Sequence, residues 1–116
     1  MKINNYSLNE KTLKFENGCL IEFKFPIRQS IVFNDMIIIL LHIGGNTQYN
    51  RNIFAADFNG VLLWQIEQSN DLDLMGYCPF ISLEMIDSEL VSHNWCGFRY
   101  IINPSTGKII SKIFTK

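Results

Sequence analysis

Hydrophobic and polar residues alternate in short runs along this chain, and turn residues separate the runs. Alternation with a period of two is typical of strands that bury one face. Asn-Gly pairs follow two of these runs, at Asn17-Gly18 and Asn59-Gly60. They predict two-residue hairpin loops of type I′, in which both residues need positive φ. A further hairpin is expected around "NPSTG", where Gly107 closes the turn.

The runs predict five strand pairs and little helix. The pairs are Lys11 to Phe15 with Cys19 to Phe25, "SIVFND" with "MIIILLHI", Ile53 to Phe58 with Val61 to Glu67, "FISLEMID" with "ELVSHNW", and the two halves of "FRYIINPSTGKIISKIF". The run "MIIILLHI" is far shorter than the roughly 20 residues of a membrane-spanning helix, so it indicates a buried strand. Residues 68–80 lack a strand pattern, and their Gly and Pro favour a loop.

The pairs also recur at a regular interval. Gly18, Gly60 and Gly107 each precede an alternating apolar strand, and they are 42 and 47 residues apart. Propeller blades repeat at about 40–50 residues, and "FNGVLLWQI" resembles the third and fourth strands of a quinoprotein-type blade. A closed propeller needs about four blades, whereas this chain holds two units and a leading half. We therefore expect one all-β domain over residues 1–116, an antiparallel meander of about 8–10 strands with blade-like hairpins. It would form a twisted sheet, a two-layer sandwich or a half-barrel, and no closed propeller.

Composition supports a folded domain in a reducing compartment. Hydrophobic residues make up 47% of the chain and charged residues 18%, which excludes an intrinsically disordered chain. The first 15 residues contain no apolar stretch of the kind that a secretory signal needs, so we expect a cytoplasmic protein without a membrane segment. Cys19, Cys78 and Cys96 form no short-spaced pair, and we expect them to be free, buried thiols.

No motif for catalysis, metal binding or cofactor binding stands out. His93 and Cys96 in "HNWC" have no second ligand pair, as a structural zinc site would require. Cys78 with His93 lacks a helix that would activate the thiol, and no glycine-rich phosphate loop precedes a helix. We expect no enzyme and no cofactor. A pocket between sheets that uses His93, Cys96 and Asp57 for a small ligand is one alternative.

Charge is segregated along the chain. Residues 52–98 contain seven acidic residues and no Lys or Arg, which gives this segment a formal charge of −7, and the segments on either side carry +2 and +4. The overall charge of −1 without a basic stripe argues against nucleic-acid binding. Two interpretations of this acidic segment are open. The acidic residues either keep a β surface soluble or steer a basic protein partner into place. The candidate partner-binding residues are the acids and rings of this segment: Glu67, Asp71, Asp73, Tyr77, Glu84, Asp87, Glu89, His93 and Trp95.

Two stretches resemble a known group of proteins. "RNIFAADFNGVLLWQIE" and "NWCGFRYIINPSTGKIISKIFTK", which span Arg51 to Lys116, look like small β-rich immunity proteins of contact-dependent growth inhibition and type VI effector systems. The resemblance implies one-to-one binding of a cognate bacterial toxin, often a basic nuclease, with the toxin active site covered. The alternative is a β-sheet scaffold that self-associates through its edges, for example through "IISKIF". Lys108 and Lys112 would oppose such edge pairing.

Overall fold

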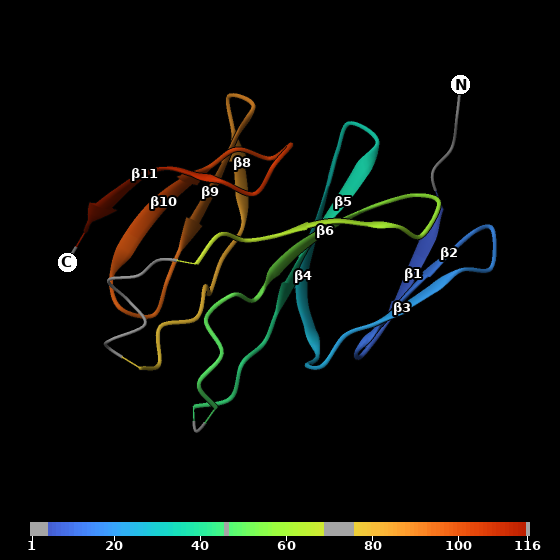
Figure 1. The fold of residues 1–116 in the computed structure, drawn as a ribbon, viewed down its shortest axis with the longest axis horizontal. Coiled ribbons are helices and arrows are strands. Elements are labelled where there is room, and N and C mark those ends of the chain that lie inside the picture. Colours follow the sequence, from blue (N-terminus) through green and yellow to red (C-terminus); the bar gives the residue numbers. More distant parts are fainter. Residues whose placement is uncertain (1–4, 46, 69–75, 116) are drawn as a thin grey trace.

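Three antiparallel sheets follow one another along the chain and stack side by side (Figure 1). The computed structural model describes residues 5–45, 47–68 and 76–115. The elements of regular secondary structure within these residues are all β-strands. The N-terminal sheet contains β1 (Tyr6–Asn9), β2 (Thr12–Phe15) and β3 (Leu20–Glu22). The middle sheet contains β4 (Ile27–Phe33), β5 (Met36–Leu41), β6 (Ile53–Asp57) and β7 (Leu62–Gln65). The C-terminal sheet contains β8 (Glu84–Ile86), β9 (Glu89–His93), β10 (Phe98–Ile102) and β11 (Ile109–Phe114).

The all-β meander is confirmed, with eleven strands in the described residues and no sheet closed into a barrel. All five expected strand pairs are present. The additional strand is β1, which pairs with β2 from Tyr6↔Phe15 to Asn9↔Thr12. Its sequence, "YSLN", alternates over only four residues and is largely exposed, which is too short a pattern to predict a strand. The blade-like units are therefore a three-stranded sheet and two four-stranded sheets.

The middle sheet is buried on both faces. Along β5, Ile37, Ile39 and Leu41 pack toward the N-terminal sheet, in a core with Leu13 and Phe15. The intervening Ile38 and Leu40 belong to a second core, which includes Leu90, Tyr100 and Ile102 of the C-terminal sheet. Successive side chains of a strand point to opposite faces, so a strand between two cores must be apolar at every position. The run "MIIILLHI" was predicted to be a buried strand from its length alone; β5 confirms this, and its place between two cores explains why the run is continuous.

The two Asn-Gly turns differ from the expected type I′ geometry. Gly18 and Gly60 have positive φ, of 92° and 90°, but Asn17 and Asn59 do not. In the first turn the N–H of Gly18 donates to the carbonyl of Phe15, and the N–H of Phe15 donates to the carbonyl of Cys19. This pattern is a three-residue loop that ends in a glycine bulge. The two-residue loop with positive φ at both positions is instead Asp87-Ser88, between β8 and β9.

A linker between the middle and C-terminal sheets is held by side-chain amides. Gln29 of β4 donates to the carbonyl of Leu83 and accepts from its N–H, at 2.6 and 2.9 Å. Asn52, which is fully buried, makes the same pair of bonds with Phe80 at 2.8 and 2.9 Å. Asn50 donates to Gly76 and accepts from Cys78. These bonds satisfy backbone groups of residues 76–83 that lie outside any sheet.

No helix in the described part of the chain has the length and apolar character to cross a membrane.

Candidate functional site

Three of the predicted acidic residues lie together on the hairpin of β8 and β9, which we call the acidic hairpin (residues 84–89). Glu84, Asp87 and Glu89 are all exposed. Glu89 is paired with Ile86, so Glu84, Ile86 and Glu89 project from the same face of the sheet. Ile86 is 39% exposed, and β8 is an edge strand. The hairpin thus presents carboxylates around an accessible apolar side chain.

Two of the predicted aromatic residues also come together, but at the other end of β9. Tyr77 and Trp95 stack edge-to-face, with ring centroids 5.7 Å apart. The Tyr77 hydroxyl donates to the carbonyl of Ile43 at 2.7 Å, and the backbone N–H of Trp95 donates to the carbonyl of Pro79 at 2.9 Å. Trp95 is 60% exposed, so it is no core residue. We call this cluster the aromatic corner (Tyr77, Pro79, Phe80 and Trp95).

The acidic hairpin and the aromatic corner do not form one surface patch. The Asp87-Ser88 turn precedes β9, and the turn that carries Trp95 follows it. Because a strand is extended, its two ends are its most distant points. The acidic residues of this hairpin therefore do not surround Tyr77 and Trp95, which were predicted to bind the same partner.

His93 has a structural partner. It is half-buried at the end of β9, where its Nδ1 lies 3.3 Å from the Ser82 hydroxyl oxygen. Its backbone N–H donates to the same oxygen at 3.1 Å, and its carbonyl accepts from the N–H of Ile81. The residue joins the linker to β9, which does not fit the role of an exposed anchor.

Glu67 joins two sheets, and two candidate acids cannot be placed. One carboxylate oxygen of Glu67 accepts from the N–H of Ile109 at 3.0 Å, and its own N–H donates to the carbonyl of Gly107. The carboxylate is thus engaged at the contact between the middle and C-terminal sheets. Asp71 and Asp73 lie outside the described residues.

The cysteines differ from expectation. Cys78 and Cys96 form a disulfide with Cα atoms 5.3 Å apart, so the expectation of free thiols is wrong for both. Cys19 is free but exposed, not buried. The disulfide pair is separated by 18 residues, a spacing that no short motif marks, and the fold brings the linker against the β9–β10 turn.

The alternative ligand site of His93, Cys96 and Asp57 finds no support in the geometry. Cys96 is in the disulfide, and the Asp57 carboxylate accepts from the N–H groups of Asn59 and Val61 in its own turn. Within the described ranges, no group of three or more His, Cys, Asp or Glu residues could hold a metal ion.

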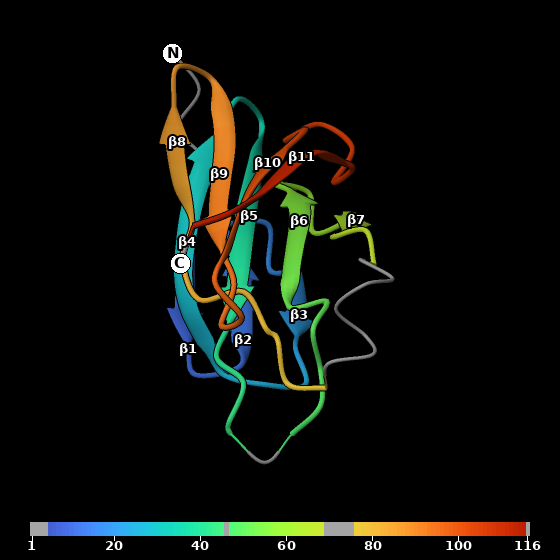
Figure 2. The ribbon, with the colours of Figure 1, turned by 90° about the vertical axis from the view of Figure 1, so that its left-hand side faces the viewer.

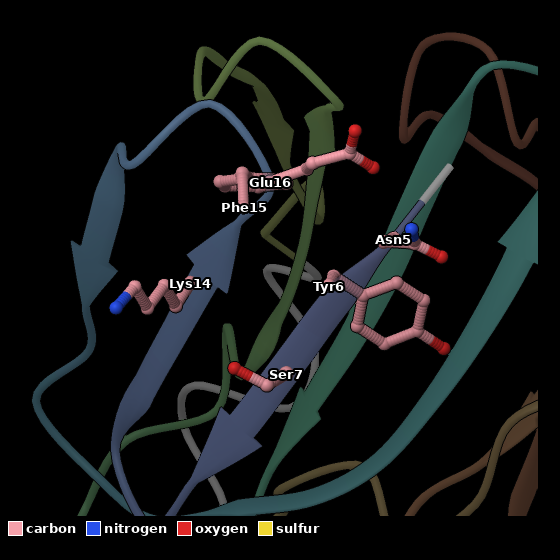
Figure 3. A pocket seen from close by; sticks show the side chains of 6 residues that line it. All are labelled: Asn5, Tyr6, Ser7, Lys14, Phe15 and Glu16. Carbon is pink, nitrogen blue, oxygen red and sulfur yellow. The ribbon is translucent and has the colours of Figure 1, made fainter. Parts of the chain in front are cut away.

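Three recesses among the described residues have room for a small ligand. The first, about 340 Å³, lies over β1 and β2, and Figure 3 shows the side chains around it diverging: Lys14 extends to one side of the strands and Tyr6 to the other. The second, about 470 Å³, is lined by Tyr49, Arg51 and Gln65, whose polar groups are bonded to one another or to nearby carbonyls. The third, about 150 Å³, lies at the aromatic corner and is also lined by the exposed residues Arg28 and His42.

Comparison with known proteins places the chain in a family without assigning an activity. No curated protein matches the sequence. One family model covers residues 3–114, and this range includes all three sheets. The chain belongs to that family, which is described as a domain of unknown function (DUF7957).

Proposed function

We propose that this protein is an immunity protein, which binds a cognate bacterial toxin and covers its active site without catalysing a reaction. The observation that supports it best is the acidic hairpin. Glu84, Asp87 and Glu89 have no ion pair or side-chain hydrogen bond with another described residue. Unpaired carboxylates around an exposed apolar side chain suit a basic protein surface, because opposite charge steers association and the apolar contact holds the complex.

The target expected from this surface is a basic toxin domain, such as a nuclease. Specific inhibitor interfaces bury about 1,600 Å² in total, far more than one hairpin offers. The interface would therefore extend from the acidic hairpin along the exposed edge of β8. The resemblance of Arg51 to Lys116 to immunity proteins points to the same function.

Co-expression tests the proposal directly. The reading frame next to this gene is expressed with and without the protein, and growth and co-purification are measured. Relief of toxicity together with a one-to-one complex is the expected result. A harmless neighbour with no co-purifying partner would count against the immunity function.

Charge reversal then tests the surface. We expect Glu84→Lys, Asp87→Lys and Glu89→Lys together to slow association with the toxin at least about tenfold at low salt, because electrostatic steering changes on-rates by about 10- to 1,000-fold. Stopped-flow or surface-based kinetics would measure the rates.

The matched control makes the same charge change elsewhere. Glu10→Lys, Glu16→Lys and Glu22→Lys alter three exposed acids of the N-terminal part of the chain. The control is expected to slow association much less. Equal slowing by both triple variants would show that net charge matters and that the acidic hairpin is not the binding surface.

The proposed place of action is the cytoplasm, and the disulfide makes this testable. Disulfides persist in oxidising compartments and are rare in the cytosol. Rapid alkylation of thiols in intact cells, followed by mass spectrometry, reports the state of Cys78 and Cys96. Reduced cysteines would support the cytoplasm, whereas an oxidised pair would place the protein and its toxin outside it.

One observation favours a second function, self-association through a sheet edge. Strand β11, which has the sequence "IISKIF", is an edge of the C-terminal sheet. Ile110, Ile113 and Phe114 on it are each more than half exposed. Lys112 is not a freely exposed charge that would oppose pairing at this edge, because its ammonium lies 5.1 Å from the centre of the Phe98 ring. Sedimentation distinguishes this scaffold function from the immunity function, as discussed below.

A further inference from the structure

The pocket at the aromatic corner combines an arginine, a histidine and aromatic side chains from four parts of the chain. Arg28 comes from β4, His42 follows β5, and Tyr77 and Trp95 come from the linker and the β9–β10 turn. Apolar side chains, including Ile43 and Phe80, complete the lining. The volume is about 150 Å³, which matches an occupant the size of benzene.

Arg28 is placed by an irregularity in β4. Ile27 pairs with Leu41, but Gln29 pairs with the adjacent Leu40, so Arg28 is an extra residue in the ladder. Bulges of this kind redirect a side chain and are frequent beside functional sites. Next to it, His42 is held by a bond from its backbone N–H to the carbonyl of Pro26 at 2.7 Å. Two side chains with N–H donors are thereby brought to one side of the pocket.

The part of the lining formed by Tyr77 and Trp95 is held in place by bonds to its surroundings. The disulfide joins the residue after Tyr77 to the residue after Trp95. The Tyr77 hydroxyl is bonded to the carbonyl of Ile43, and the Trp95 backbone to that of Pro79. A wall held by a covalent bond and two hydrogen bonds loses little conformational freedom when a ligand binds.

The donors at this pocket have no partner in the described residues. The Arg28 guanidinium, the His42 imidazole and the Trp95 indole N–H each lack a hydrogen bond or ion pair there, and the lining contains no Asp or Glu from the described ranges. A guanidinium matches a carboxylate with two parallel hydrogen bonds. The apolar lining suits a flat hydrocarbon body attached to that group.

We propose that this pocket binds a monocarboxylate with a small planar apolar body, with Arg28 holding the carboxylate and Tyr77 and Trp95 packing on the body. The inference is independent of the immunity function, because the pocket lies at the opposite end of β9 from the acidic hairpin. Phosphate fits less well, since one guanidinium offers a single fork and the remaining lining is mostly apolar. A free aromatic acid and the carboxyl end of a peptide share the favoured chemistry.

Titration followed by ¹H–¹⁵N NMR tests the proposal. The two tryptophans give two indole signals, and Trp64 is an internal reference because its N–H is bonded to the carbonyl of Pro104 at 2.9 Å. Benzoate is expected to shift the Trp95 indole and the amides of Cys78, Phe80 and Ile81 in a saturable manner and to leave Trp64 unchanged. Benzamide, which has the same shape without the charge, is expected to bind at least about tenfold more weakly.

Matched variants and ligands decide the outcome. Arg28→Gln is expected to weaken benzoate binding about tenfold or more, while Arg99→Gln, on the outer face of the C-terminal sheet, leaves it unchanged. The spectrum of each variant also reports whether it is folded. Stronger binding of N-acetylphenylalanine than of benzoate would identify the carboxyl end of a peptide as the source of the carboxylate. Stronger binding of benzoate would identify a free aromatic acid. Absence of a saturable shift, equal shifts with benzamide, shifts with inorganic phosphate alone, or unaltered binding by Arg28→Gln would each overturn the proposal.

Discussion

At the scale of single residues, Gly107 leaves no room for a side chain because the indole of Trp64 lies against it. A Cβ at this position would be 2.5 Å from Cε3 of Trp64, and the φ of Gly107 is +78°. Gly60 repeats the arrangement, with a Cβ position 2.6 Å from Cβ of Cys19. Both glycines therefore close a hairpin and also allow one sheet to approach the preceding one.

We expect Gly107→Ala to lower the free energy of unfolding by about 3 kcal/mol. Positive φ costs a non-glycine residue about 1 kcal/mol, and forcing a methyl group into a packed contact costs about 1–3 kcal/mol. Denaturant unfolding followed by fluorescence would measure the change.

Gly18→Ala is the matched control for this loss. Its φ is +92°, but nothing lies within 4 Å of its Cβ position, so we expect a loss of only about 1 kcal/mol from backbone strain. Equal losses at both glycines would show that the Trp64 contact contributes nothing.

The sequence predicted the turn role of these glycines but not their packing role. Gly60 and Gly107 stand out as turn residues because they follow a polar stretch and precede an apolar strand. Their contacts, Cys19 and Trp64, are more than 40 residues away in the chain. Local patterns do not record which sheet will lie beside a turn.

At the scale of elements, the linker of residues 76–83 depends on a few amide side chains in place of a sheet ladder. Asn52 makes three hydrogen bonds, to the carbonyls of Leu41 and Phe80 and from the N–H of Phe80. Phe80 and Leu83 in turn fill the core between the middle and C-terminal sheets. The polar bonds thus position an apolar segment.

We expect Asn52→Ala to destabilise the domain by about 3 kcal/mol. The change leaves up to three backbone groups unpaired at a buried position, and each costs about 1–3 kcal/mol less any relaxation. Thermal and denaturant unfolding are the measurements.

Asn50→Ala provides the comparison, because Asn50 makes the same type of bonds to the linker but is only part-buried. Water can replace its bonds, and we expect a loss of about 1 kcal/mol. A smaller effect at Asn52 than at Asn50 would contradict the structural role assigned to the buried amide.

Strands that alternate apolar and polar residues next to a clear turn could be predicted from the sequence. A strand defined mainly by its hydrogen bonds to a neighbouring strand could not. The five hairpins follow from alternation and turn residues. Strand β1 depends on hydrogen bonds to β2, and its own sequence shows no strong pattern. The type I′ expectation failed because Asn-Gly also suits a glycine bulge, in which only the glycine adopts positive φ.

At the scale of the whole molecule, the two outer faces of the stack differ in polarity. The outer face of the N-terminal sheet includes Ser7 and Lys14, which are paired across β1 and β2. By strand register, the outer face of the C-terminal sheet combines Glu84 and Arg99 with apolar Ile86, Val91 and Ile113. Figure 2 shows that the first strands of the sheets, β1, β4 and β8, lie along one side of the stack. The three blade-like sheets follow one another without closing a ring.

We expect the protein to be a monomer at tens of micromolar, because the outer face of the N-terminal sheet is polar and charged residues such as Glu84 and Arg99 interrupt the apolar side chains on that of the C-terminal sheet. Sedimentation velocity measures the state. Ile110→Lys with Ile113→Lys, both on β11, should leave the sedimentation coefficient unchanged. A dimer that this double variant dissociates would instead favour the scaffold function.

The sequence predicted several residues of the candidate site but not which of them lie together. Acidic residues are clustered in the sequence, and three of them meet on one hairpin. Tyr77 and Trp95 were proposed as anchors, and they do pack together. Arg28 and His42, which share their pocket, carry no local signal, because a bulge in β4 and the end of β5 bring them there.

The sequence by itself determined the strand class, the hairpins and the buried central strand, since these follow from side-chain periodicity and turn residues within a few positions of one another. Only the tertiary structure decided the Cys78–Cys96 disulfide, the separation of the acidic hairpin from the aromatic corner, and the pocket around Arg28. Those features join residues that are distant in the chain. Their contacts arise from how three sheets pack, and packing depends on the shapes of whole faces and not on local pattern.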